Sequence, residues 1–173
     1  MAKRQRRIPP VNNSTSLSTR RLVCGAVIAA IYAVLTLVLQ PISYGAIQIR
    51  FSEALTLLPI LMAEAVPGVT LGCLLANILG GSMLPDIVFG TLATLLAAVC
   101  TRRLRSRFWL AAAMPVIANG LIVGAVVHYC YAPEMALPLC MLTVAIGEAV
   151  ACFIVGPLLI GVLKKLPDGV ITD

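Results

Sequence analysis

The chain has 173 residues, of which 60% are hydrophobic and only 12% are charged. A water-soluble domain usually carries about a quarter charged residues, so this composition excludes a soluble enzyme and a disordered chain. An integral membrane protein with little mass outside the bilayer remains. The net charge is +6, but the basic residues stand in groups between apolar runs. Such grouping indicates control of membrane topology and argues against a nucleic-acid partner.

The apolar runs divide into helices of about 20 residues, which is the length that crosses a hydrocarbon core of about 30 Å. The run over 51–80 is too long for one span, and Pro59 and the Val66-Pro67-Gly68 break divide it into two short helices. We therefore predict an all-α membrane protein with six transmembrane helices. Their expected ranges are 22–39, 51–66, 67–80, 86–101, 108–129 and 137–163.

The distribution of charge favours six spans over five. With a cytoplasmic N-terminus, six spans put the arginine cluster at 102–107 and the C-terminus inside, so 12 of the 13 basic residues are cytoplasmic and only Arg50 is outside. We therefore predict a multi-pass protein of the cell membrane with both termini in the cytosol. Residues 1–21 would form a basic, mobile tail, 22–165 the membrane domain, and 166–173 a short C-terminal tail.

Few polar side chains fall within the predicted spans. Inserting a charged side chain near the bilayer centre costs a free energy of roughly 2.5–3.5 kcal/mol, so each such residue is expected to have a structural or functional role. Nearly all of them fall in the outer half, whereas Glu64 lies at the inner end of its span. The pattern predicts a cavity that opens to the outside and binds a polar small molecule. The residues in the outer half or near mid-depth are Glu53, Asn77, Asp86, Asn119 and Glu148.

Several of these residues have a purely structural explanation as well. Asp86 and Glu53 begin predicted helices, where an acidic side chain also serves as a cap. Asn77 and Asn119 are equally well explained by hydrogen bonds between helices. Glu148 has the weakest structural explanation, because it is deep and no basic residue in its own span can pair with it. We expect Glu148 to bind a ligand or a buried partner.

Other motifs exclude an enzyme and a resident cofactor. The six cysteines form no C-x-x-C motif, and the chain shows no metal spacing and no Ser–His pairing by position. Cys130 and Cys140 flank a predicted outer loop and could form a disulfide, although free thiols are favoured. Ala26 and Ala30 are four residues apart on one helix face, a spacing that lets another helix approach closely, either inside the bundle or from a partner.

Several segments are similar to one transporter family. The specific part is 50–94, which holds Arg50-Phe-Ser-Glu-Ala-Leu-Thr-Leu-Leu-Pro59, Val66-Pro-Gly68, Gly72-Cys-Leu-Leu-Ala-Asn77 and Asp86-Ile-Val-Phe-Gly-Thr-Leu-Ala-Thr94, with Gly147-Glu148 further on. These segments resemble the queuosine-precursor transporter family of the QueT type. That family belongs to the substrate-binding S components of energy-coupling factor (ECF) transporters. The resemblance runs from about Arg21 to Leu163.

The resemblance implies a six-helix S component that captures its substrate outside the cell. Such a protein works with a transmembrane T component and two cytoplasmic ATPases, and the small-residue face of its first helix contacts the T component. Ala26 and Ala30 match that face. S components have no nucleotide site of their own, and this chain has no G-x-x-x-x-G-K-[ST] motif.

The implied substrate is a 7-deazaguanine such as preQ0 or preQ1. A carboxylate can accept hydrogen bonds from N1–H and the exocyclic amine of a guanine edge. A second carboxylate can pair with the aminomethyl cation of preQ1. The candidates are Glu53, Asp86 and Glu148, with Asn77 at the ring carbonyl. Aromatic residues that could stack on the base are Phe51, Phe89, Tyr44 and Tyr129.

Two other functions stay open at this point. An S component for another vitamin-like substrate would share the fold and bind a different ligand. A stand-alone secondary carrier would transport without ATPases, on a proton gradient. A membrane scaffold without a transport role would not require the buried Glu148.

Overall fold

The computed structural model describes residues 13–39 and 50–165, which form helices joined by turns. The α-helices are α1 (Asn13–Val38), α3 (Ala65–Leu79), α4 (Leu84–Arg103), α5 (Phe108–Val126), α6 (Leu137–Val150) and α7 (Gly156–Leu163). A 3₁₀-helix, η1 (Phe51–Ile60), precedes α3. Two π-helical turns, η2 (Val127–Tyr131) and η3 (Ala151–Val155), continue α5 and join α6 to α7. The predicted all-α class is confirmed, since the described residues contain no strand.

Four helices in the described part of the chain are long and apolar enough to cross a membrane. They cover Thr19–Val38, Leu84–Arg103, Phe108–Tyr131 and Leu137–Leu163. Phe51–Ile60 and Ala65–Leu79 are apolar but shorter. The prediction of six spans therefore rests on these two short helices, which lie where two short spans are expected.

Two boundaries differ from the prediction. α1 begins at Asn13, within the segment predicted to be a mobile tail. Hydropathy marks only the part of a helix that lies in hydrocarbon, and backbone hydrogen bonding can continue beyond it. The break between the short helices falls at residues 61–64 rather than at Val66-Pro67. Pro67 lies in the first turn of α3, where a helix has no partner for the backbone N–H, so proline is tolerated there.

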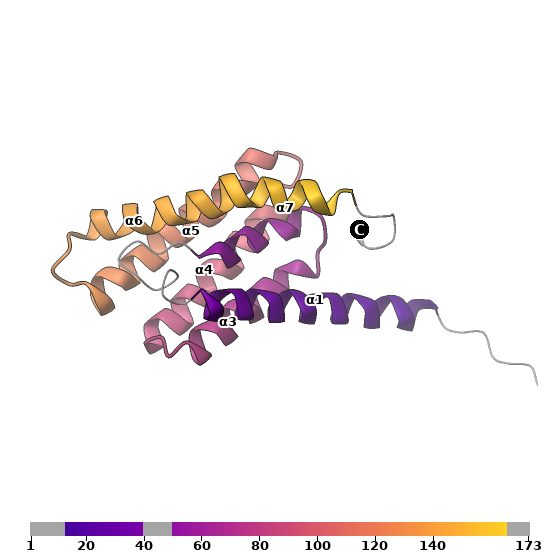
Figure 1. Cartoon of the computed structure of the whole chain (residues 1–173), viewed down its shortest axis with the longest axis horizontal. Helices are drawn as coiled ribbons and strands as arrows, with labels where there is room; N and C mark the ends of the chain where they lie inside the picture. The colour runs from indigo at the N-terminus through magenta and orange to yellow at the C-terminus, as the bar shows by residue number, and fades with distance from the viewer. Residues whose placement is uncertain (1–12, 40–49, 166–173) are drawn as a thin grey trace, which may run out of the picture.

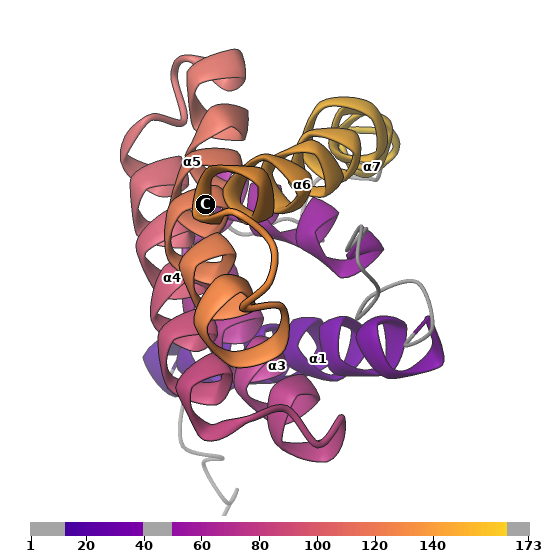
Figure 2. The same cartoon turned by 90° about the vertical axis from the view of Figure 1, so that its left-hand side faces the viewer.

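α1, α6 and α7 run roughly along the long axis of the molecule, whereas α4 and α5 are inclined across it, and η1 lies in the interior (Figure 1). α1 packs on α3, α3 on α4, α4 on α5 and α5 on α6, and η1 contacts most of them. Figure 2 looks along this axis and shows η1 between α1 and α6. Residues 52–59 of η1 are all buried. A 3₁₀-helix of 10 residues is uncommon, since most runs end after three or four, and such stretches often mark functional segments.

Two glycines of α3 bring it close to α1. A Cβ at Gly68 would lie 2.8 Å from the Gly25 carbonyl oxygen, and one at Gly72 would lie 2.7 Å from the Tyr32 Cβ. A side chain at either position would therefore force the helices apart. This close packing fixes Tyr32, which is 1% exposed, in the interior beside η1.

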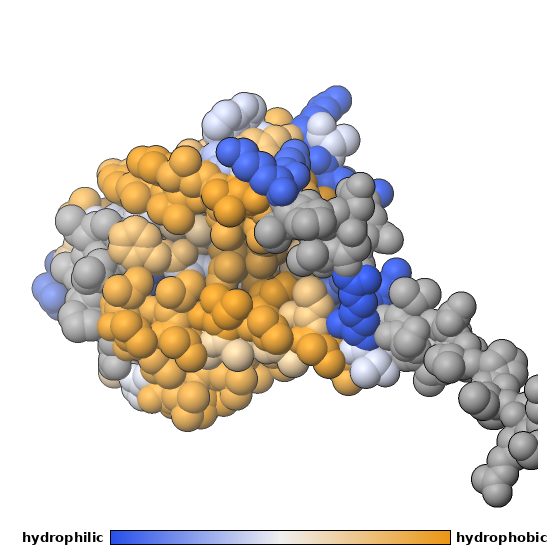
Figure 3. Space-filling model, turned by 45° about the vertical axis from the view of Figure 1, so that its right-hand side comes forward, coloured by the Kyte–Doolittle hydropathy of each residue, from blue (hydrophilic) through white to orange (hydrophobic). Residues whose placement is uncertain are grey.

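The basic groups lie at one end of the bundle. The beginning of α1, the turn between α4 and α5 and the end of α7 share the right-hand end in Figure 1. These segments carry Arg20 and Arg21, the cluster at 102–107, and Lys164 and Lys165. Figure 3 shows hydrophilic side chains at this end and a broad apolar surface beside them. The arrangement agrees with a membrane protein whose grouped basic residues, among those that the structure describes, face one side, with Arg50 as the exception.

Candidate binding site

Six buried polar residues form the polar cluster, and none of them is more than 5% exposed. η1 and the residue before it supply two, and α3, α4, α5 and α6 supply one each. Polar groups buried in this way need partners, because burial removes their hydrogen bonds to water. The cluster consists of Arg50, Glu53, Asn77, Asp86, Asn119 and Glu148.

Arg50 connects the carboxylates of the cluster. Its Nη2 lies 3.9 Å from Asp86 Oδ2, and its charge also acts on Glu53 and Glu148. A buried guanidinium needs such partners, since transfer of an unpaired charge from water is costly. Sequence analysis placed Arg50 outside the membrane and did not include it in the site. The available signal was that Arg50 is the basic residue that belongs to no group.

Asp86 ties three elements together at one side of the cluster. Its Oδ2 accepts a hydrogen bond of 3.2 Å from the Tyr131 hydroxyl, which itself accepts one of 2.9 Å from the Met83 backbone N–H. Asn77 Nδ2 donates to the Asp86 carbonyl oxygen at 3.4 Å. Asp86 lies in the first turn of α4, but the helix has no side-chain cap hydrogen bond. The N-cap residue is Met83, and the negative charge of Asp86 in the first turn suits the helix N-terminus as well as the cluster.

Glu53, Asn119 and Glu148 form the other side of the cluster. The Tyr32 hydroxyl donates to Glu53 Oε1. Glu148 interacts electrostatically with Glu53, and the Asn119 amide lies beside both carboxyl groups. Neither polar atom of Asn119 reaches hydrogen-bonding geometry with any described residue. Sequence analysis had counted Asn119 among the polar residues but had not included it in the site.

Several atoms of the cluster lack hydrogen-bond partners within the described residues. They are Glu53 Oε2, Asp86 Oδ1, Glu148 Oε2 and both polar atoms of Asn119. A buried polar atom without a partner costs about 1–3 kcal/mol, so native proteins have few of them. Their concentration around three carboxylates and one guanidinium suits a small ligand that donates several hydrogen bonds or carries positive charge.

The predicted site residues differ in how they are engaged. Glu53, Asp86 and Glu148 all lie around Arg50. The amide of Asn77 bonds to the Asp86 carbonyl oxygen and lies 3.7 Å from Cys73 Sγ, so it is used inside the protein. Sequence analysis also missed Tyr32, although it is the one aromatic residue in the first apolar run.

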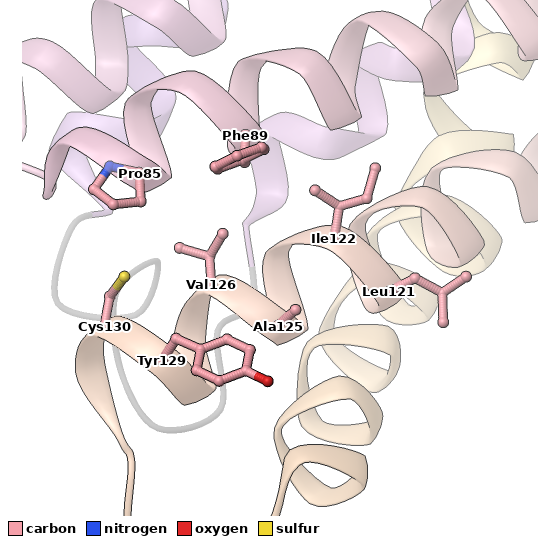
Figure 4. Close-up of a pocket in the computed structure, with 8 residues that line it drawn as sticks. All are labelled: Pro85, Phe89, Leu121, Ile122, Ala125, Val126, Tyr129 and Cys130. Atoms are coloured by element: carbon pink, nitrogen blue, oxygen red, sulfur yellow. The ribbon is translucent and has the colours of Figure 1, made fainter.

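An apolar groove lies between α4 and α5, separate from the polar cluster (Figure 4). Its volume is about 530 Å³. Phe89 and Tyr129, two of the predicted stacking residues, line this groove and are 51% and 73% exposed. Phe51 is half-buried next to Arg50, and Tyr44 lies outside the described residues. The groove is lined by Pro85, Phe89, Leu121, Ile122, Ala125, Val126, Tyr129 and Cys130.

The remaining candidates concern the helix surface and the cysteines. Ala26 and Ala30 are exposed on α1, whereas Ala29 and Ala33 are buried against the bundle. Cys130 and Cys140 are free thiols, so the disulfide is not formed. Within the described residues, no group of three His, Cys, Asp or Glu side chains is placed to hold a metal ion.

Comparison with known proteins places the chain in a family. The model of the QueT transporter family matches residues 22–165. The queuosine precursor transporter QueT of Lactococcus lactis subsp. cremoris (strain MG1363) is 38% identical over 79 residues. That alignment covers 44% of this chain and 46% of the relative, so it spans about half of the relative's length. No solved structure matches the chain. The expectation that the chain is not an enzyme agrees with this result, and the chain belongs to the QueT transporter family.

Proposed function

We propose that this chain is the substrate-binding S component of an ECF-type importer. It captures a queuosine precursor of the 7-deazaguanine type, such as preQ0 or preQ1, from outside the cell for ATP-driven uptake. The name of the Lactococcus lactis relative supports the substrate class. The observation that carries the proposal is the polar cluster, in which buried carboxylate and amide atoms without partners face one another across η1, α5 and α6.

The chemistry of a 7-deazaguanine complements this cluster. The base presents N1–H and an exocyclic amine as donors and a ring carbonyl as acceptor. Glu53 and Glu148 each have a carboxylate oxygen without a partner among the described residues, and both are acceptors. Three carboxylates against the one guanidinium of Arg50 leave an excess of negative charge when all are ionised, which favours the aminomethyl cation of preQ1. We assign Asn77 to holding the turn between α3 and α4.

The proposed partners are a transmembrane T component and two cytoplasmic ATPases. The chain has no Walker A motif, so ATP-driven uptake would require ATPases supplied by other proteins. Ala26 and Ala30 are exposed on α1 and allow close approach of a partner helix in the membrane. A stand-alone carrier is the alternative. It requires uptake by this chain without ATPases, driven by a proton gradient.

Titration of the purified chain in detergent with preQ1 and preQ0 tests the proposal. We expect the wild type to bind at least one of them without its partners. Glu53→Gln and Glu148→Gln should each weaken binding by about 10- to 100-fold, because a hydrogen bond to a charged group contributes about 1.5–3 kcal/mol. Glu64→Gln is the matched control, since Glu64 lies at the other end of η1, next to α3, and should leave the affinity unchanged. Unchanged affinity in both cluster variants would refute the proposal.

A further inference from the structure

Asn119 is the residue of the polar cluster whose polar atoms both lack a hydrogen-bond partner among the described residues. It is 2% exposed, and both its Oδ1 and Nδ2 lack a hydrogen-bond partner within the described residues. An amide that served to join helices would bond to a neighbouring backbone or side chain. Asn77 does so, since its Nδ2 donates to the Asp86 carbonyl oxygen at 3.4 Å. The two buried asparagines are therefore used differently.

The position of Asn119 places this amide among acceptors. α5 packs closely on α6, where a Cβ at Gly120 would lie 3.0 Å from the Ala145 Cβ. Glu148 stands one turn beyond Ala145 on α6, and η1, which carries Glu53, also contacts α5. The Asn119 amide lies beside both carboxyl groups. Two carboxylate oxygens without partners among the described residues thus lie near this amide, which has N–H donors to offer.

The hydrogen-bond donors and acceptors of the Asn119 amide and the two carboxylates are complementary to those on one edge of a base. A 2-amino-6-oxo purine edge offers an acceptor followed by two donors, and an amide N–H beside a carboxylate offers a donor followed by acceptors. An adenine-type edge has a different order of donors and acceptors and would leave groups of the site without partners.

We propose that Asn119 is a substrate-binding residue, whose Nδ2 donates to the 6-oxo group of the base while Glu53 and Glu148 accept from its N–H groups. This inference rests on the proposed function. It assigns the hydrogen bond to the ring carbonyl to Asn119 rather than to Asn77. It makes Asn119 the residue that selects 6-oxo bases, because a site built to bond a given group rejects analogues that lack it.

The test compares two ligands on three proteins. The ligands are 7-deazaguanine and 6-thio-7-deazaguanine, which keeps N1–H and the 2-amino group but replaces the 6-oxo oxygen with a weakly accepting sulfur. The proteins are the full-length wild type, Asn119→Leu and the control Thr101→Val, which changes a buried polar residue outside the cluster. Leucine keeps the branched shape and the number of heavy atoms but makes no hydrogen bond. Affinity and thermal unfolding are measured for each in detergent.

The wild type should prefer 7-deazaguanine by about 10-fold or more. Asn119→Leu should lose this preference, with 7-deazaguanine weakened by about 10- to 100-fold and the analogue much less affected. Its melting temperature should equal or exceed that of the wild type, because two buried polar atoms without partners are removed. Thr101→Val should instead lower the melting temperature and keep the preference, since it removes the 3.0 Å hydrogen bond from the Thr101 hydroxyl to the Ala111 carbonyl oxygen, at the end of α4 opposite to Asp86.

Two results would overturn the inference. One is an Asn119→Leu variant that keeps the wild-type preference. The other is a variant that unfolds at a lower temperature and loses both ligands in equal proportion, which would make Asn119 a structural residue. Asn119→Ala, compared for the same two ligands, decides the matter if the leucine variant does not fold. A wild type that binds neither ligand would refute the proposed function itself.

Discussion

Arg50 is the residue on which the electrostatics of the cluster depend. It is 5% exposed and is the basic residue that faces Asp86, Glu53 and Glu148. Removal of one member of a buried ion pair usually destabilises a protein by about 3–5 kcal/mol, because the other charge stays buried without compensation. Arg50 should therefore be required to keep the carboxylates together in the absence of substrate.

A double-mutant cycle measures this role. We expect Arg50→Gln to lower the melting temperature strongly and Asp86→Asn to lower it less, because asparagine keeps an oxygen that can accept the hydrogen bond from Tyr131. Combined, the two changes should destabilise by at least about 1 kcal/mol less than their sum, as coupled residues do. Thermal unfolding of the four proteins in detergent gives the coupling. Strict additivity would show that the 3.9 Å pair has no energetic role.

The sequence could predict the acidic residues of the site but not their partners. Glu53, Asp86 and Glu148 stand out because a carboxylate within an apolar run needs a reason. Arg50 could not be placed, because its position next to a helix start is compatible with either water or the interior. Asn77 and Asn119 look alike in the sequence. Only the packing of α3, α4, α5 and α6 determines which amide finds a partner.

At the scale of elements, the site depends on the close contact between α1 and α3. Gly72 lies against Tyr32, and the Tyr32 hydroxyl donates to Glu53. A displacement of α1 would therefore move Tyr32 and, through its hydrogen bond, the Glu53 carboxylate of η1. The helix contact is thus part of the support of the site, although neither α1 nor α3 contributes a carboxylate.

Gly72→Ala should destabilise the protein by about 1–3 kcal/mol and weaken substrate binding, because its Cβ would meet Tyr32 at 2.7 Å and the Ala29 carbonyl oxygen at 2.8 Å. Gly161→Ala is the matched control. A Cβ there meets nothing within 4 Å, and alanine favours a helix by roughly 1 kcal/mol over glycine. Thermal unfolding and ligand titration of both variants check this. Equal effects of the two substitutions would argue against the close contact.

The helices themselves were largely predictable from the sequence. The apolar runs and the Pro- or Gly-containing breaks locate α3, α4, α5 and the continuous run from α6 to α7 to within a few residues, but they do not predict the π-helical turn η3 that divides this last run. The break at 61–64 was misplaced, because a proline in a first turn and a proline that ends a helix have the same appearance in a sequence. The 3₁₀ conformation of η1 was not predictable, since its apolar pattern also fits an α-helix.

The whole molecule is asymmetric along its long axis. The basic segments lie at one end, whereas Asp86 and Tyr131 belong to the turns at the other end (Figure 1). From the positive-inside rule we expect the first end to face the cytosol, which would put the turns near the polar cluster on the outer side. This orientation is the one that a protein capturing its substrate from outside requires.

The molecule also offers two very different places for a ligand. The polar cluster supplies buried acceptors and an amide, whereas the groove between α4 and α5 is lined almost entirely by apolar side chains (Figure 4). A base with several N–H donors would leave them without partners in the groove, which costs affinity. We therefore propose that the substrate binds in the polar cluster and not in the groove.

An experimental structure of the chain with 7-deazaguanine bound tests this assignment most directly. The account predicts the ring between η1, α5 and α6, with its N–H groups on Glu53 and Glu148 and its carbonyl on Asn119. A ligand held in the groove beside Phe89 and Tyr129, without contact to either glutamate, would contradict it.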